Sequence, residues 1–81
     1  MIVKILGTGC AKCKALEQKL INLKSRHQLD FEIEKVTQLN DIMSYDVMMT
    51  PGLVINEKLV SSGKVSKDDE ILKWIKEAQN A

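Results

Sequence analysis

The chain has 81 residues, of which 44% are hydrophobic and 28% charged, and its net charge is +1. This length allows one domain, residues 1–81, and the ordinary composition excludes disordered and low-complexity proteins. No apolar run approaches the roughly 20 residues of a membrane-spanning helix, and the first residues lack the pattern of a signal peptide. We therefore predict a cytoplasmic protein without a membrane segment.

The first half of the chain predicts a strand, a long helix, a second strand and a short helix. Residues 2–6 form an apolar run that ends at Gly7, which is typical of a buried strand followed by a turn. From residue 11 to about residue 27 the spacing becomes helical. The face that this spacing defines consists of Cys13, Leu16, Leu20, Leu23 and His27. Residues 30–36 alternate as a half-buried strand does, and residues 38–45 have helical spacing.

The second half predicts a hairpin and a final helix. Thr50-Pro51-Gly52 breaks the chain, and residues 53–55 and 59–61 form two strands with a tight connection. The last helix opens at Ser66, which we predict as its N-cap, because acidic residues follow in the first turn. This order predicts an α/β fold with three helices and a four-stranded mixed sheet, parallel at the start and antiparallel at the hairpin.

The two cysteines of the chain, Cys10 and Cys13, predict redox chemistry. A disulfide between them would close too small a loop to stabilise the fold much. Thiol–disulfide exchange requires a thiolate, which the unpaired N–H groups and partial positive charge of a helix N-terminus favour. Cys10 stands at that position, and the charge of Lys12 lies nearby. Cys13 follows one turn later on the apolar face, where a thiol is less exposed and less ionised.

This asymmetry predicts that Cys10 is the nucleophile and Cys13 the resolving thiol of a thiol–disulfide oxidoreductase. Exchange needs no organic cofactor and no metal, because the disulfide itself carries the electrons. One C-x-x-C pair would also supply two thiolates for Cu(I) or half of a zinc site, so a soft-metal carrier remains an alternative. A redox sensor without turnover is a third hypothesis. We interpret Met43, Met48 and Met49 as core residues or as the lining of a groove beside Pro51, not as metal ligands.

The motif Cys10-Ala11-Lys12-Cys13 after a first strand, combined with Thr50-Pro51 before a hairpin, resembles the small thioredoxin-like, redox-active disulfide proteins, whose minimal fold is similar to glutaredoxin. The resemblance covers nearly the whole chain. It implies that Pro51 is cis and packs close to Cys10, and that the backbone of Thr50 pairs with an extended substrate. We add Thr8 and Lys12, beside and between the cysteines, to the predicted substrate contacts.

The chain also departs from the larger relatives that it resembles. Thioredoxin has an aromatic residue before the first cysteine, where Gly9 stands here, and a buried acidic residue in the preceding strand, which here offers Lys4. The copper chaperones have a methionine where this chain has Thr8. The electron donor therefore stays unassigned between a reductase and a small thiol.

The predicted partners are disulfide-bearing proteins or small molecules, together with that reductase or thiol donor. With three aromatic residues in the chain, the base-stacking surface of a nucleic-acid-binding protein is not expected. We predict a monomer.

Overall fold

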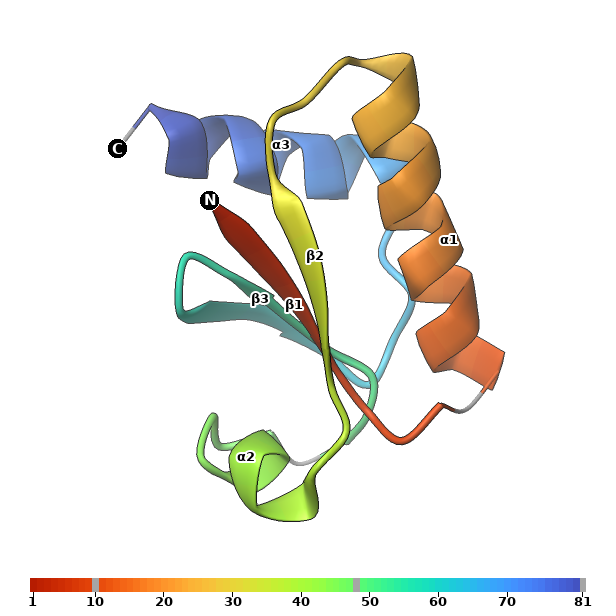
Figure 1. The fold of residues 1–81 in the computed structure, drawn as a ribbon, viewed down its shortest axis with the longest axis vertical. Helices are drawn as coiled ribbons and strands as arrows, with labels where there is room; N and C mark the ends of the chain where they lie inside the picture. The colour runs from red at the N-terminus through yellow and green to blue at the C-terminus, as the bar shows by residue number, and fades with distance from the viewer. Residues whose placement is uncertain (10, 48, 81) are drawn as a thin grey trace.

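A computed structural model describes residues 1–9, 11–47 and 49–80 of the chain. Over these residues the chain forms four strands and three helices (Figure 1). In chain order they are β1 (Ile2–Leu6), α1 (Ala11–Arg26), β2 (Glu32–Val36), α2 (Leu39–Met43), β3 (Gly52–Ile55), β4 (Lys58–Ser62) and α3 (Asp68–Gln79). The predicted α/β class and the predicted order of elements are confirmed.

The strands form one mixed sheet in the order β2-β1-β3-β4. β1 pairs with β2 in parallel, and α1 supplies the crossover that a parallel pair requires. β1 and β3 are antiparallel, as are β3 and β4. The turn of the hairpin is Asn56-Glu57, and both residues have positive φ, as expected for a tight connection that matches the twist of the strands.

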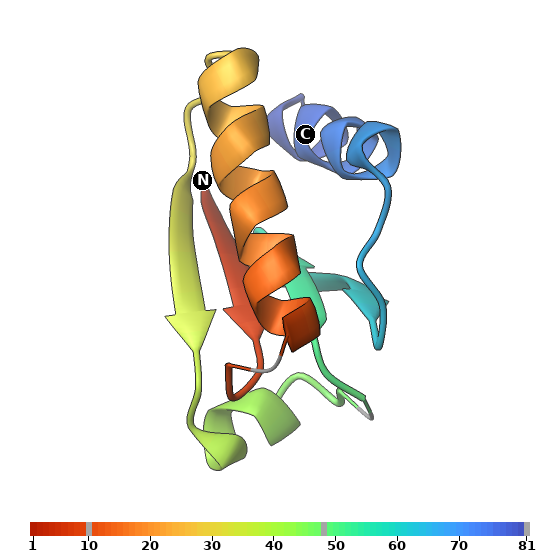
Figure 2. The same cartoon turned by 90° about the vertical axis from the view of Figure 1, so that its right-hand side faces the viewer.

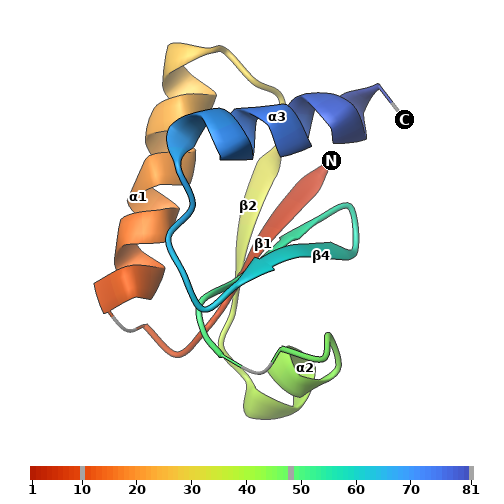
Figure 3. The same ribbon diagram turned by 180° about the vertical axis from the view of Figure 1, so that it is seen from behind.

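The larger core lies on the face of the sheet that α1 and α3 cover (Figure 3). Alternation along β1 directs Val3 and Ile5 to this face, where they meet the apolar face of α1. The buried residues of α1 are those predicted from helical spacing, except that the helix ends at Arg26 and His27 is exposed. The full cluster is Val3, Ile5, Leu16, Leu20, Leu23, Phe31, Leu53, Ile55, Ile71 and Ile75.

The opposite face of the sheet carries a smaller core under α2. Leu6 of β1 and Val54 of β3 pack there with Ile42, the buried residue of α2. Figure 2 shows that α2 lies at the end of the sheet where β1 ends and α1 begins. None of the described helices is long and apolar enough to cross a bilayer.

The predicted N-cap of the last helix is wrong. The helix begins at Asp68 with Lys67 as its N-cap residue, and the Glu70 carboxylate accepts a hydrogen bond of 3.4 Å from the Lys67 backbone N–H. Ser66 is instead buried, and its hydroxyl donates a hydrogen bond of 3.1 Å to Oγ of Ser61 in β4. The Ser66 carbonyl accepts a further bond from Nζ of Lys19 in α1. Ser66 therefore joins the sheet to α1, just before α3 begins, instead of capping α3.

We expect Ser66→Ala to lower the free energy of unfolding by about 1–3 kcal/mol, because the buried Ser61 hydroxyl loses its partner. Urea unfolding at neutral pH measures the loss. Ser62→Ala, at an exposed position one residue along β4, is the matched control. An equal effect of the two substitutions would show that the buried pair contributes nothing.

Candidate redox site

Gly7 lies at the centre of the candidate site, immediately after β1. In the register of β1 and β3, Leu6 lies opposite Gly52, so Gly7 is level with Pro51. A Cβ placed on Gly7 would overlap Sγ of Cys13 and would lie 3.7 Å from Cβ of Thr50. The absence of a side chain at Gly7 therefore lets the Cys13 sulfur and the Thr50 side chain approach the same point of the backbone.

Cys13 lies in the first turns of α1 with its side chain directed inward. It is 5% exposed and shares the buried face of the helix with Leu16 and Leu20. This placement agrees with the sequence prediction of a second thiol that is shielded from solvent. Cys10 lies outside the described residues, so its nucleophilic role stays a prediction from the sequence and from its place directly before Ala11, where α1 begins.

The Thr50–Pro51 segment forms the other side of the site. Its peptide bond is cis, the isomer that the family resemblance implies. Pro51 is fully buried, and its carbonyl accepts a hydrogen bond of 2.9 Å from the Gly63 N–H at the end of β4. Thr50 is exposed beside it. A buried, hydrogen-bonded Pro51 thus holds an accessible Thr50 next to Gly7 and Cys13.

The two remaining predicted substrate contacts, Thr8 and Lys12, lie in different places relative to Cys13. Thr8 is exposed and lines a cleft together with Cys13. Lys12 is exposed on α1. The structure therefore brings Thr8, Cys13 and Thr50 together around Gly7, whereas Lys12 extends the site along the solvent side of the helix.

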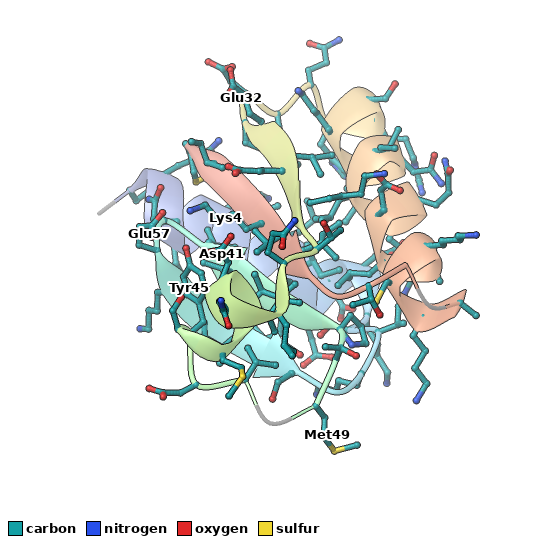
Figure 4. The ribbon with its side chains drawn as sticks, turned by 60° about the horizontal axis from the view of Figure 1, so that its bottom comes forward. Lys4, Glu32, Asp41, Tyr45, Met49 and Glu57 are labelled. Carbon is teal, nitrogen blue, oxygen red and sulfur yellow. The ribbon has the colours of Figure 1, made fainter. Side chains whose placement is uncertain are left out.

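Met43 and Met49 are not core residues. Met43 and Met49 are 61% and 65% exposed, which corrects the interpretation of these two side chains as core packing. Met49 projects from the loop before Pro51 (Figure 4) and lies against Gly63. Met48 is outside the described residues. Among the residues that are described, no group of three or more His, Cys, Asp or Glu side chains could hold a metal ion.

The comparisons with known proteins agree with this geometry. A family model described as a thioredoxin domain matches residues 1–76. The chain belongs to the thioredoxin family. A thioredoxin of Methanocaldococcus jannaschii is 33% identical over 76 residues, which cover 94% of this chain and 87% of the relative. A thioredoxin of Methanothermobacter thermautotrophicus is 33% identical over 73 residues, 90% of this chain and 95% of that one.

The fold is shared more widely than the sequence. A solved structure described as that of a malarial protein matches this thioredoxin-family chain with a TM-score of 0.68, covering 95% of this chain and 94% of its own. At 15% identity this likeness shows the fold alone. The two relatives named above support thiol–disulfide oxidoreductase activity at the level of the family.

Lys4 of this thioredoxin-family chain lies away from Cys13, on the α2 face of the sheet. Its Nζ is 2.8 Å from Oε1 of Glu57 and donates a hydrogen bond of 2.9 Å to the Tyr45 hydroxyl, which donates one of 3.1 Å to Oε2 of Glu57 (Figure 4). The hydrogen bond with Glu57, and then the one with Tyr45, raise the pKa of Lys4 above its usual range. The hydrogen bond from Lys4 lowers the pKa of Glu57. The cluster ties β1 to the turn after α2 and to the hairpin turn, and sequence reasoning did not find it.

We expect Glu57→Gln to destabilise the fold at neutral pH and to have little effect in acid. Because the folded-state pKa of Glu57 is lowered, its contribution is fully present above the ordinary carboxyl value of about 4.3 and is lost as pH falls through the lower folded value. Urea unfolding of both proteins at about pH 7 and about pH 2 measures the difference. A stability difference that stayed constant between these pH values would contradict the role of the Glu57 charge.

Proposed function

We propose that the chain is a thiol–disulfide oxidoreductase in which Cys10 attacks a disulfide of a protein or small molecule and Cys13 resolves the mixed disulfide. The observation that carries the proposal is the contact of the Cys13 sulfur with Gly7, beside Thr50. A cysteine with only a packing role does not require a solvent-exposed segment such as Thr50 beside it. Here Cys13, the second thiol of the motif, is buried at the start of α1. The exposed Thr50 can contact a substrate whose disulfide reacts at the motif.

The proposed cycle moves two electrons from the cysteine pair to the substrate. The Cys10 thiolate forms a bond to one sulfur of the substrate disulfide, and the other sulfur leaves as a thiolate that takes up a proton. Cys13 loses its proton and attacks the Cys10 sulfur, which releases the second substrate thiolate and leaves a Cys10–Cys13 disulfide. A reductase or a small thiol then returns the pair to the dithiol. The first turn of α1 favours the Cys10 thiolate through its unpaired N–H groups.

The other predicted residues bind the substrate and take no part in the thiol–disulfide exchange itself. In this proposal the backbone of Thr50 pairs with an extended substrate segment, because Thr50 is the exposed residue beside the buried Pro51. Thr8 contacts the substrate from the turn after β1, and Lys12 attracts acidic segments to the exposed side of α1. No organic cofactor or metal takes part in the proposed cycle.

Turnover distinguishes this proposal from the two alternatives. A small amount of metal-free protein is incubated with a disulfide-bearing protein substrate and excess dithiothreitol, and the double variant Cys10→Ser/Cys13→Ser serves as the control. We expect a rate that is proportional to the concentration of the chain and absent with the double variant. A redox sensor would be oxidised once without turnover. A soft-metal carrier would show no rate and would bind Cu(I) in an equimolar ratio.

A further inference from the structure

A cleft of about 350 Å³ opens beside Cys13, on the side of α1 that faces β2. It is bounded by the turn after β1, the first two turns of α1 and the end of β2. Its charged lining residues are Lys14 and Glu17 from α1 and Lys35 from β2. A space of this size, with these charged groups on its wall, has room for several water molecules, each of which occupies about 30 Å³ in the liquid.

Glu17 is the carboxylate among the described residues that line this cleft. It lies four residues after Cys13 on α1, so the two side chains are neighbours on one face of the helix. Lys35 reaches across from β2, with its Nζ 3.3 Å from Oε2 of Glu17. This ion pair holds the carboxylate over the cleft, with the Glu17 side chain only 27% exposed.

The second step of exchange, in which Cys13 attacks the mixed disulfide, requires a proton acceptor near Cys13. Cys13 must lose its proton before its sulfur can attack, and at 5% exposure it has little access to bases in bulk water. Cys13 and Glu17 line the same cleft, and a water molecule there would connect the thiol with the carboxylate, which is the arrangement that a general base acting through water requires. Lys4, in the strand that leads to the motif, cannot serve, because its ammonium group is bound to Glu57 on the opposite face of the sheet.

We propose that Glu17 accepts the Cys13 proton through water in this cleft when Cys13 attacks the mixed disulfide, an inference that rests on the proposed function. The proton passes from the Cys13 thiol to water, and from that water to the Glu17 carboxylate. The Cys13 sulfur bonds to the Cys10 sulfur, and the substrate sulfur leaves with the electron pair of the broken bond. Glu17 then returns its proton to solvent or to the departing thiolate.

The sign of the Glu17 effect separates a proton acceptor from a nearby negative charge. A negative charge beside Cys13 disfavours its thiolate, so removing a carboxylate that acted only as a charge would speed the second step. Removing a proton acceptor would slow it. The Glu17→Gln substitution keeps the size of the side chain while removing both its charge and its basicity.

Stopped-flow mixing of the reduced protein, in slight excess, with dipyridyl disulfide resolves the two steps. This reagent is uncharged, and its pyridinethione product absorbs light, so attack by Cys10 and resolution by Cys13 each release one equivalent. We expect Glu17→Gln to leave the first phase unchanged and to slow the second at about pH 6, on the order of a hundredfold. The difference in second-phase rate between Glu17→Gln and the unsubstituted protein should become smaller as pH rises, because hydroxide then removes the Cys13 proton without a general base.

Two further variants complete the test. Glu17→Asp keeps the carboxylate and should restore part of the second-phase rate. Glu34→Gln removes a charge from an exposed position in β2 next to Lys35 and should leave both phases unchanged. A second phase in Glu17→Gln that is as fast as the unsubstituted protein, or faster, would overturn the role of Glu17 and leave the proposed function intact. If the unsubstituted protein lacked the second phase, the proposed function would fail together with this inference.

Discussion

We expect Cys13→Ser to stop the reaction at the mixed disulfide and Cys10→Ser to prevent it from starting. Without Cys13, the substrate remains attached to Cys10 because no internal thiol displaces it. Without Cys10, the remaining thiol is 5% exposed and lies against Gly7, so a protein disulfide has little access to it. In the dithiothreitol assay Cys10→Ser should lose turnover to the level of the uncatalysed reaction, and Cys13→Ser should lose most of it, because dithiothreitol then has to release the substrate from Cys10 in place of Cys13.

Mass spectrometry after mixing with a disulfide substrate tells the two variants apart. Cys13→Ser should carry one covalent substrate adduct per chain, which dithiothreitol removes, and Cys10→Ser should carry none. The result opposite to this, with an adduct on Cys10→Ser only, would reverse the proposed roles. Equal loss of Cu(I) binding in both variants, with no adduct in either, would favour the metal-carrier hypothesis.

Gly7→Ala should impair the site and the fold together. The new Cβ would overlap the sulfur of Cys13, so either the thiol rotates away from its position or β1 shifts. Overpacking of this kind typically costs about 1–3 kcal/mol of unfolding free energy. Because the displaced atom is the sulfur that we propose as the resolving one, the second phase of the dipyridyl disulfide reaction should also slow, whereas the first phase should change less.

Ala78→Gly is the matched control for this loss of stability. It lies in the last turn of α3, away from Cys13, and a glycine in a helix costs up to about 1 kcal/mol. Urea unfolding and stopped-flow kinetics are measured for both variants. A second phase that slowed equally in the two would mean that general destabilisation, and not the contact at Gly7, controls the reactivity of Cys13.

The elements of the fold could be predicted because their signals are local. The spacing of Leu16, Leu20 and Leu23 defines α1 within the helix itself, and the apolar run of β1 is marked at its end by Gly7. The mixed sheet follows from the order of these elements. The prediction of Ser66 as an N-cap was wrong because the partner of its hydroxyl is not local. The hydroxyl bonds to Ser61 in the sheet, which a helix pattern cannot identify.

The candidate site also contains some features that local sequence patterns predict and others that depend on the folded structure. The motif and the Thr50-Pro51 step are visible in the sequence, but the role of Gly7 depends on how the turn after β1 folds back to the sulfur of Cys13. A glycine directly between a strand and a C-x-x-C motif was the available signal, and it indicated only a turn. The Lys4 cluster joins residues that lie 41 and 12 positions apart in its two hydrogen bonds, so no local pattern predicts it.

The central claim is that Cys10 and Cys13 form a reversible two-electron centre. The most direct test is a redox titration of the purified, metal-free chain in thiol–disulfide buffers, with the state of the pair read by mass after alkylation. We predict a single two-electron transition at a potential within the range of known thiol–disulfide oxidoreductases, about −270 to −120 mV. A pair that stayed as two thiols until strongly oxidising conditions would contradict the claim.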